Sequence, residues 1–447
     1  MTMRLPAAGL LLLALTLAGL ALHDRQAQDL DAGVRGLLFV ALLGAAGLAY
    51  LAAVRLVLAA PLPRGALAWA LGIAVALRLT VLPAAPFLSG DLYRYLWDGR
   101  VQQAGINPYR HIPADPALAA LRDGAVYPHI NRRDYAPTIY PPAAQIIFRA
   151  IAAAGRTPFA VKAAMVMCEA LAVTVLLRLL ALARLPAARV LIYAWNPLAV
   201  WSFAGNGHID AAAWTLAVLA MLLGVLGHRR SAGAALGAAV LVKFLPAVIA
   251  PALWRRGDWR LPLAALATIA ALYALYAGAG RQVFGFLGGY GQEEGLRDGS
   301  GFWPVALVQR LGLPLPHAGA SYILSGMIAF AALGLWIALH WPWPEDRAGA
   351  ARRAAVAAAV LGGSAMGLLG PHYPWYYPWL ALPAALAPCA SVIWLSVAPL
   401  VLTLSQDDRV ILPAAIFLPA LLLAALDVRR AWRKRRGPAA LFVERVS

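Results

Sequence analysis

The first candidate for chemistry is Asp91, an acid at the first turn after the outer end of the apolar run 66–83. A carboxylate at the end of a membrane-length segment costs free energy unless water or a partner reaches it, so it is a functional candidate by default. Such a carboxylate can take a proton from a nucleophile as a general base. The alternative is that Asp91 caps the helix that follows it. The two roles are compatible.

Two other polar features lie within or between apolar runs. Lys243 stands in the middle of "LVKFLPAVIAP", where a cation needs nearby water or a counter-charge such as a carboxylate or a lipid phosphate. The turn "GNGHID" places His208 and Asp210 between two predicted spans, with glycines that permit close backbone approach. A helix beginning near His208 would present free N–H groups to an anion. A simple capped turn explains the same residues.

Aromatic residues accompany these polar groups. "GPHYPWYYP", at 370–378, combines His372 with Tyr373 and Trp375, which suits either a belt at the membrane interface or a grip on a phosphate or a sugar ring. Tyr140, just before two prolines, is a second candidate for lining a pocket. We expect the chain to enter its next helix at Pro141 or Pro142.

The stretch "DLYRYLWDGRVQQAG" that begins at Asp91 has helical periodicity. It predicts an amphipathic helix on the membrane surface, with an apolar stripe and a polar stripe directed away from it. The apolar stripe is formed by Leu92, Tyr95 and Leu96, and the polar residues are Arg94, Asp98 and Gln102.

The composition defines the setting in which these residues must work. The chain has 447 residues, of which 62% are hydrophobic and 13% charged, as in a polytopic membrane protein. The net charge of +18 comes from bases in short gaps between apolar runs, where they set topology, so we expect contact with membrane lipids and none with nucleic acid. The two cysteines lie in apolar runs. With no nucleotide or metal motif we predict no cofactor, and a single divalent ion at Asp91 stays open.

Apolar runs of membrane length recur along the chain, and hydrocarbon leaves helices as the available structure. We therefore predict an all-α polytopic membrane protein in a single domain, 1–447. The runs are 6–22, 36–59, 66–83, 160–182, 189–204, 208–226, 232–254, 261–279, 319–341, 354–370, 376–388, 390–404 and 409–427.

The basic residues predict the topology. With a cytoplasmic N-terminus, Arg64, Arg184, Arg352 and the basic tail 428–447 all fall on the cytoplasmic side. The run 232–254 breaks this alternation because both of its flanks are basic. Since it also contains Lys243 and Pro246, we predict a re-entrant hairpin of two half-helices, beside about 12 transmembrane helices. A crossing segment is the alternative.

This topology places the remaining hydrophilic stretches on the outer face. They are a first loop, 84–158, with interfacial helices, a second loop, 281–318, that is glycine-rich and suits a lid, and the short segments 370–378 and 405–409. The turn 205–210 opens on the same side. We therefore expect any chemistry on the outer face.

Taken together, these motifs resemble a known superfamily. The first loop reads "DxYxYxxxGxxxxGxNPY" from Asp91 to Tyr109, and "GHID", "VKFLP" and "HYPWYYPW" follow. The chain resembles the GT-C superfamily of integral-membrane glycosyltransferases, and most closely the bacterial polyprenyl-phosphate-mannose-dependent mannosyltransferases. The resemblance implies a GT-C-like fold in the bacterial inner membrane, with the active site facing the periplasm.

The resemblance also implies an activity. We expect a sugar, mannose, to pass with inversion from a polyprenyl-phosphate donor to a hydroxyl of a lipid or glycan acceptor. In that superfamily an acid at this position of the first loop is the general base, which is Asp91 here. Many members carry a second acid nearby, so the division of work between Asp91 and Asp98 stays open.

The same chemistry assigns expected roles to other residues. Cations should neutralise the phosphate that leaves. The candidates for the donor phosphate are Lys243, His372, His208, Arg94 and Arg281, and those for the sugar or acceptor pocket are Tyr93, Tyr109, Tyr140, Asp210, Tyr373 and Trp375.

One other class of function fits the same features. A kinked segment with a buried lysine also suits a secondary transporter or flippase of an anionic lipid-linked substrate. A transporter usually shows two similar halves, and the first-loop motif does not recur in the second half. The sequence does not identify the sugar, the acceptor or the oligomeric state.

Overall fold

The computed structural model describes residues 4–22, 32–63, 65–313 and 317–436. All regular structure among these residues is helical, and they contain no strand. The prediction of an all-α protein is therefore confirmed. It follows from the length and continuity of the apolar runs, whose backbone groups can be satisfied in hydrocarbon within each helix.

The longer helices form the bundle and the core of the first loop. Their bounds are α1 Arg4–Ala21, α2 Ala32–Ala59, α3 Ala66–Val81, α4 Asp91–Gln103, α5 Pro142–Ala154, α6 Pro158–Leu182, α9 Asp210–Val225, α10 Arg229–Val242, α12 Arg260–Ala274, α15 Ala318–His340, α16 Arg347–Leu369 and α19 Ile411–Arg436. The start of α5 at Pro142 confirms the predicted helix entry.

Short helices fill the connections. The α-helical pieces are α7 Leu191–Ala194, α8 Pro197–Ala199, α11 Ala250–Leu253, α13 Leu287–Glu293, α14 Trp303–Arg310, α17 Ala381–Leu386 and α18 Ala390–Leu395. The 3-10 turns are η2 Pro116–Leu121, η3 Tyr127–His129, η4 Ala187–Val190, η6 Leu245–Ile249, η7 Ala277–Phe284, η8 Pro374–Tyr376, η9 Pro378–Leu380 and η10 Ala398–Thr403, and η5 Val200–Gly205 is a π-helix.

Five of the described helices are long and apolar enough to cross a membrane, and up to seven spans result if each of two bent helix pairs is one span. Several predicted spans are broken instead of continuous. The run 189–204 is divided among α7, α8 and η5, and the runs 376–388 and 390–404 consist of short helices. Prolines such as Pro197, Pro378 and Pro399 begin these pieces, because proline fits the first turn of a helix but not its interior.

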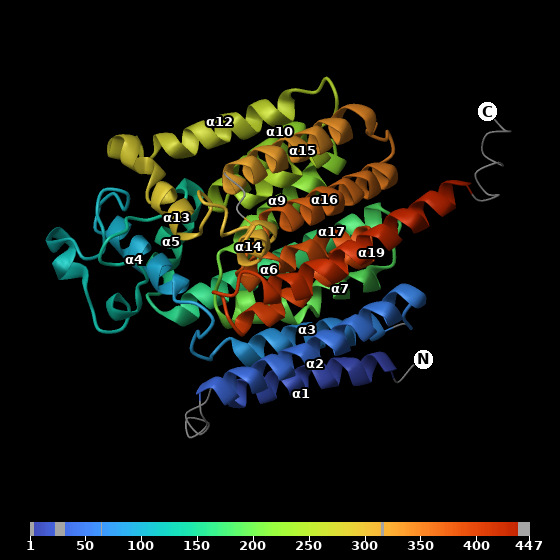
Figure 1. Cartoon of the computed structure of the whole chain (residues 1–447), viewed down its shortest axis with the longest axis horizontal. Coiled ribbons are helices and arrows are strands. Elements are labelled where there is room, and N and C mark those ends of the chain that lie inside the picture. Colours follow the sequence, from blue (N-terminus) through green and yellow to red (C-terminus); the bar gives the residue numbers. More distant parts are fainter. Residues whose placement is uncertain (1–3, 23–31, 64, 314–316, 437–447) are drawn as a thin grey trace.

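The long helices lie alongside one another, and the polar segments gather beyond one end of the bundle (Figure 1). Helices α4, α5 and α13 lie at that end, whereas α1 begins and α19 ends at the opposite end. This arrangement agrees with the predicted separation of the hydrophilic loops from the first part of the basic tail, 428–436, whereas 437–447 and Arg64 lie outside the described residues. We call the two ends the loop end and the tail end.

Two buried cations tie α3 to α6. Arg78 of α3 forms an ion pair of 2.6 Å with Glu169 of α6, and it also donates to the carbonyl oxygen of Ala194 at 2.7 Å. Lys162 of α6 donates to the carbonyl oxygens of Val81, the last residue of α3, and of Ala84, just beyond it. Removing one partner of a buried ion pair typically costs about 3–5 kcal/mol. These residues therefore fix helix packing at a distance from the polar loops.

The segment between α9 and α12 turns back on itself. Helix α10 ends at Val242, Lys243 is extended, and η6 and α11 follow. Arg229, the first residue of α10, donates to the carbonyl oxygen of Leu253, the last residue of α11, at 2.7 Å and lies 3.3 Å from Asp258. The first and last residues of this stretch are therefore in contact, and Lys243 lies near its turning point.

Candidate active site

A cavity of about 240 Å³ lies at the loop end of the bundle. The first loop contributes residues 88–91, Arg94, 131–132, 136–137 and 139–140 to its lining, and the rest comes from Lys243, Tyr290, Tyr373, residues 375–376 and Gln406. The four hydrophilic stretches that the sequence assigns to one face all contribute to it. The cavity therefore combines polar side chains from segments that are far apart in the chain.

Asp91 lies at the edge of this cavity, as the first residue of α4. Its Oδ1 accepts a hydrogen bond of 2.7 Å from Asn131, and its Oδ2 lies 3.7 Å from Nδ1 of His208. The N-cap residue is Gly90, and no side chain caps α4. The carboxylate is 20% exposed, which leaves it accessible from the cavity. Asp91 is thus held in one orientation by Asn131 and does not act as a helix cap.

The turn at 205–210 holds the backbone that leads into Asp91. Asn206 accepts hydrogen bonds from the backbone N–H groups of Phe87 and Leu88, at 2.9 and 2.8 Å, and donates to the carbonyl oxygen of Trp201. Gly207 has a φ of 70°, a conformation that glycine adopts without a steric penalty. The "GNGHID" turn therefore positions the start of α4 as well as its own polar residues.

Lys243 reaches the cavity from the turning point after α10. Its Nζ donates to Oδ2 of Asp210 at 2.7 Å and lies 4.0 Å from the centre of the Tyr376 ring. Asp210 is fully buried, and its Oδ1 has no hydrogen-bond partner among the described residues. The predicted counter-charge for Lys243 is therefore Asp210, and the ammonium group still lines the cavity.

His208 lies behind Asp91 and is fully buried. Its ring stacks on Trp375 with a centroid distance of 4.0 Å, and neither ring nitrogen forms a hydrogen bond within the described residues. Trp375 itself lines the cavity. His208 thus supports both the cavity wall and the side of Asp91 that faces away from Asn131.

An acid of the second loop, Glu293, binds two residues of the first loop. Glu293 accepts from Arg132 at 2.6 Å and from Tyr135 at 3.0 Å. Arg132 also lines the cavity and has a φ of 53°, in the left-handed region that residues with a side chain rarely adopt. Arg132 therefore links the cavity wall to α13.

The neighbouring acid, Glu294, anchors the late aromatic segment. Its carboxylate lies 2.6 Å from Nε2 of His372 and accepts from Tyr373 at 3.0 Å. Burial raises the pKa of Glu294, but the hydrogen bond and the charge of His372 outweigh burial, so the net pKa is below its usual range. Because folding favours the ionised carboxylate, Glu294 contributes stability at pH values above its ordinary pKa. This stability is lost as the pH falls through the lowered pKa of the folded state. His372 does not line the cavity.

Gly285 allows a direct test of the contact between the second loop and the first loop. Phe286 N–H donates to the carbonyl oxygen of Thr138 at 3.1 Å, and Gly285, with a φ of 54°, lies so close that an added Cβ would collide with that oxygen. We expect Gly285→Ala to detach the second loop and to accelerate cleavage of residues 285–301 by an added protease at least about tenfold, since the change combines strain with a clash. Gly288→Ala, where an added Cβ meets no atom within 4 Å, is the matched control. Equal cleavage of both variants would contradict the docking role.

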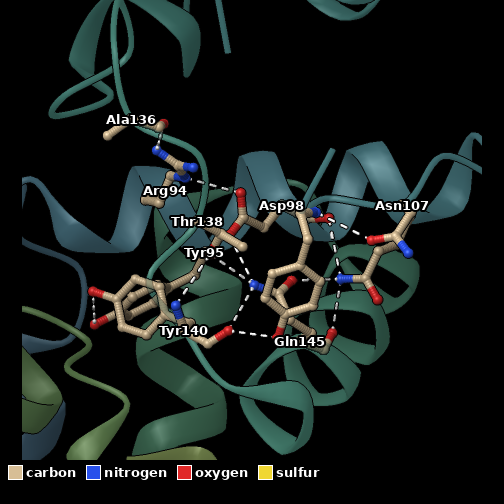
Figure 2. Close-up of polar contacts among 10 residues, drawn as sticks. Arg94, Tyr95, Asp98, Asn107, Ala136, Thr138, Tyr140 and Gln145 are labelled. Carbon is tan, nitrogen blue, oxygen red and sulfur yellow. Dashed lines mark hydrogen bonds and ion pairs between the residues drawn. The ribbon is translucent and has the colours of Figure 1, made fainter. Parts of the chain in front are cut away.

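Asp98 belongs to a buried network beside the cavity and not to its lining (Figure 2). Arg94 Nε donates to Oδ1 of Asp98 at 2.9 Å, and Gln145 donates to Oδ2 at 3.0 Å. Arg94 also donates to the carbonyl oxygen of Ala136, and Gln145 to Thr138. With both oxygens engaged, Asp98 holds segment 136–145 against α4. These contacts give no support to the idea that Asp98 shares the role of general base with Asp91.

The same network corrects the prediction for α4. The helix is present, but its polar residues do not face water: Arg94, Asp98 and Gln102 are 4%, 1% and 8% exposed. Helix α5 covers them, because Gly99 allows the backbone of α4 to approach Phe148 closely and Gln145 satisfies the polar groups. A helical stripe in the sequence does not show that a second polar helix will cover it.

The remaining predicted residues divide between the cavity and its surroundings. Tyr140, Tyr373 and Trp375 line the cavity, as does Arg94. Tyr109 donates to the carbonyl oxygen of Tyr140 at 2.8 Å and so acts from behind the wall. The other two lie elsewhere: the ring of Tyr93 packs at a tilt against His129, and Arg281 is exposed outside the cavity.

The predicted site residues leave out several polar or aromatic residues of the lining: Ser89, Asn131, Arg132, Tyr290, Tyr376 and Gln406. Arg132 stands in a basic pair that reads as a solvated surface, and Asn131 precedes it with no periodic signal. Only the path of the loop brings Asn131 to Asp91. Among the described residues, no group of three His, Cys, Asp or Glu side chains is arranged to hold a metal ion.

Comparison with models of protein families gives one match. Residues 4–255, more than half of the chain, match the model described as alpha-(1->6)-mannopyranosyltransferase, N-terminal domain. This region contains Asp91, Asn131, His208, Asp210 and Lys243. Comparison with curated proteins and with solved structures gives no match.

Proposed function

The chain belongs to the alpha-(1->6)-mannopyranosyltransferase family and is a membrane glycosyltransferase, and from this premise we propose how its cavity works. We propose that Asp91 is the general base of an inverting transfer of mannose from a polyprenyl-phosphate donor to an acceptor hydroxyl. The observation that carries the proposal is a carboxylate oriented by Asn131 at a cavity that Lys243 also lines.

In the proposed reaction, the acceptor oxygen attacks the anomeric carbon and gives its proton to Asp91. The bond between that carbon and the phosphate oxygen breaks, and polyprenyl phosphate leaves. Since a single displacement inverts the anomeric centre, an α-(1→6) product requires a β-linked donor. The leaving phosphate needs no proton, but it needs positive charge close by. Lys243 and Arg132 supply cations in the cavity wall.

The walls of the cavity suit a sugar ring. Tyr373, Trp375 and Tyr376 form a run of rings, with centroids of Tyr373 and Trp375 4.9 Å apart. Aromatic faces pack against the C–H groups of a sugar, and the flanking polar groups can bind its hydroxyls. We propose that these residues hold the mannosyl group between Asp91 and Lys243.

We further propose the topology. The cavity faces the outside of a bacterial inner membrane, which about 12 segments cross, some of them as broken helices such as α7, α8 and η5. Residues 232–254 form a re-entrant hairpin whose two flanks lie in the cytoplasm. The contacts of Arg229 with Leu253 and Asp258 support this, because they bring those two flanks together. The cost of Lys243 at membrane depth is reduced by Asp210 and by the cavity.

The hairpin is tested by single cysteines at two exposed positions, Arg230 and Trp259, in a chain whose own two cysteines are replaced. We expect an impermeant maleimide to label neither position in intact cells and both after permeabilisation. Labelling of position 259 alone in intact cells would show that the segment crosses the membrane.

The activity is tested with purified protein, a membrane extract as acceptor, and radiolabelled polyprenyl phosphates that carry mannose, glucose or galactose. We expect transfer from the mannose donor and removal of the label by an α-(1→6)-specific mannosidase. Transfer from none of the three donors would refute the donor class. Transfer of glucose or galactose in preference to mannose would refute the proposed sugar.

A further inference from the structure

A second large cavity lies at the tail end of the bundle, away from the active site. It has a volume of about 1000 Å³ and is lined by residues from α2, η4, α16, α18 and α19. Three arginines, Arg55, Arg189 and Arg430, contribute to its wall. Arg55 lies in the last turns of α2, and Arg430 lies near the end of α19.

These arginines are more numerous than the acids beside them. None of the three forms an ion pair within the described part of the chain. The one acid in the lining is Asp427, whose Oδ2 accepts from the backbone N–H of Ser391 at 3.0 Å and from its hydroxyl at 2.9 Å. The wall therefore carries three cations and one acid, so its net charge is positive. A cluster of this kind favours an anion.

The cavity continues as an apolar groove. A neighbouring cavity of about 360 Å³ shares Leu51 and Trp394 with it and extends along α2 through Leu48 and Gly44. Its other lining residues on η10 and α19 are apolar, among them Val401 and Ala415. An added Cβ at Gly44 would meet no atom within 4 Å, so this part of the groove is open.

We propose that the two cavities together form a binding site for an anionic phospholipid, with its phosphate at Arg55, Arg189 and Arg430 and an acyl chain along Leu51 and Trp394. Helices α2 and α19 both contain candidate membrane spans, and their arginines lie in the last turns, which is the depth of lipid headgroups. The apolar continuation distinguishes a lipid from a free phosphate ion. This inference is independent of the proposed reaction.

The test uses the purified full chain in neutral detergent and measures the midpoint of thermal unfolding. Phosphatidylglycerol, phosphatidylcholine with the same acyl chains, and inorganic phosphate are titrated separately. A ligand that binds the folded state raises the midpoint. We expect phosphatidylglycerol alone to do so. An equal shift with phosphatidylcholine or with phosphate would overturn the proposal.

Variants locate the site. In Arg55→Gln/Arg189→Gln we expect the half-saturating phosphatidylglycerol concentration to rise at least about tenfold, since each basic contact near a membrane contributes about fivefold. Arg230→Gln, an exposed arginine outside the groove, is the matched control and should match the wild type. Gly44→Leu should weaken lipid binding while leaving the arginines intact. An unchanged concentration in the double variant, or in Gly44→Leu, would overturn the assignment.

Discussion

Asp91→Asn is expected to lower the rate of mannosyl transfer by about 10²–10⁴-fold, the range typical for loss of a general base. The amide keeps the shape of the side chain and can still meet Asn131, but it cannot take the proton of the acceptor hydroxyl. Steady-state transfer from polyprenyl-phosphate mannose measures kcat, and the donor KM should change little because Asp91 acts on the acceptor. Transfer at the wild-type rate would remove Asp91 from the mechanism.

Two other acids in the first loop serve as controls for this variant. Asp134→Asn makes the same change at a side chain that is 71% exposed, and it should leave the rate unchanged. Asp98→Asn removes the charge that faces Arg94 in the buried network, so we expect a lower thermal stability with turnover per folded molecule within about tenfold of the wild type. A loss of turnover in Asp98→Asn equal to that in Asp91→Asn would restore a shared base role.

The second large effect is expected at Lys243. Lys243→Met should lower kcat/KM for the lipid-linked donor by about 10²-fold or more, because the proposed leaving phosphate loses a cation of the cavity wall. The substitution also leaves Asp210 buried without its partner, which by itself costs about 3–5 kcal/mol of stability. A fall in activity of the single variant therefore has two causes that must be separated.

The double variant Lys243→Met/Asp210→Asn separates the two causes. It removes the uncompensated charge at Asp210, so we expect recovery of the thermal midpoint without recovery of transfer. Lys243→Arg keeps the charge, and we expect it to retain more activity than either. If the double variant recovers both stability and transfer, Lys243 is a structural partner of Asp210 and does not contact the phosphate.

The acids around the cavity differ in whether their carboxylates are still free to accept a proton. Asp98, Glu293 and Glu294 have partners that belong to the fold, and their contacts join the first loop to α5, α13 and the late aromatic segment. Asp91 is held on one oxygen by a neutral amide, so its proton-accepting capacity is not consumed by a cation. This difference in partners is the structural basis for assigning the chemistry to Asp91.

The amino-acid sequence by itself determined the helical class, the membrane-length runs and the grouping of polar loops at one end, because each follows from local hydropathy and from the need to satisfy backbone groups. It also singled out Asp91 and Lys243, since a charge beside or within an apolar run is costly wherever the chain folds. Both residues line the same cavity.

Only the tertiary structure decided which polar residues share a site. The pairing of Asp91 with Asn131 spans 40 residues and that of Lys243 with Asp210 spans 33, and contacts over such separations depend on loop paths that leave no periodic signal. The same is true of Asp98, whose stripe on α4 reads as solvent-facing until α5 covers it. The local sequence determines the free-energy cost of placing each charge beside or within an apolar run. The tertiary packing determines which partner offsets that cost.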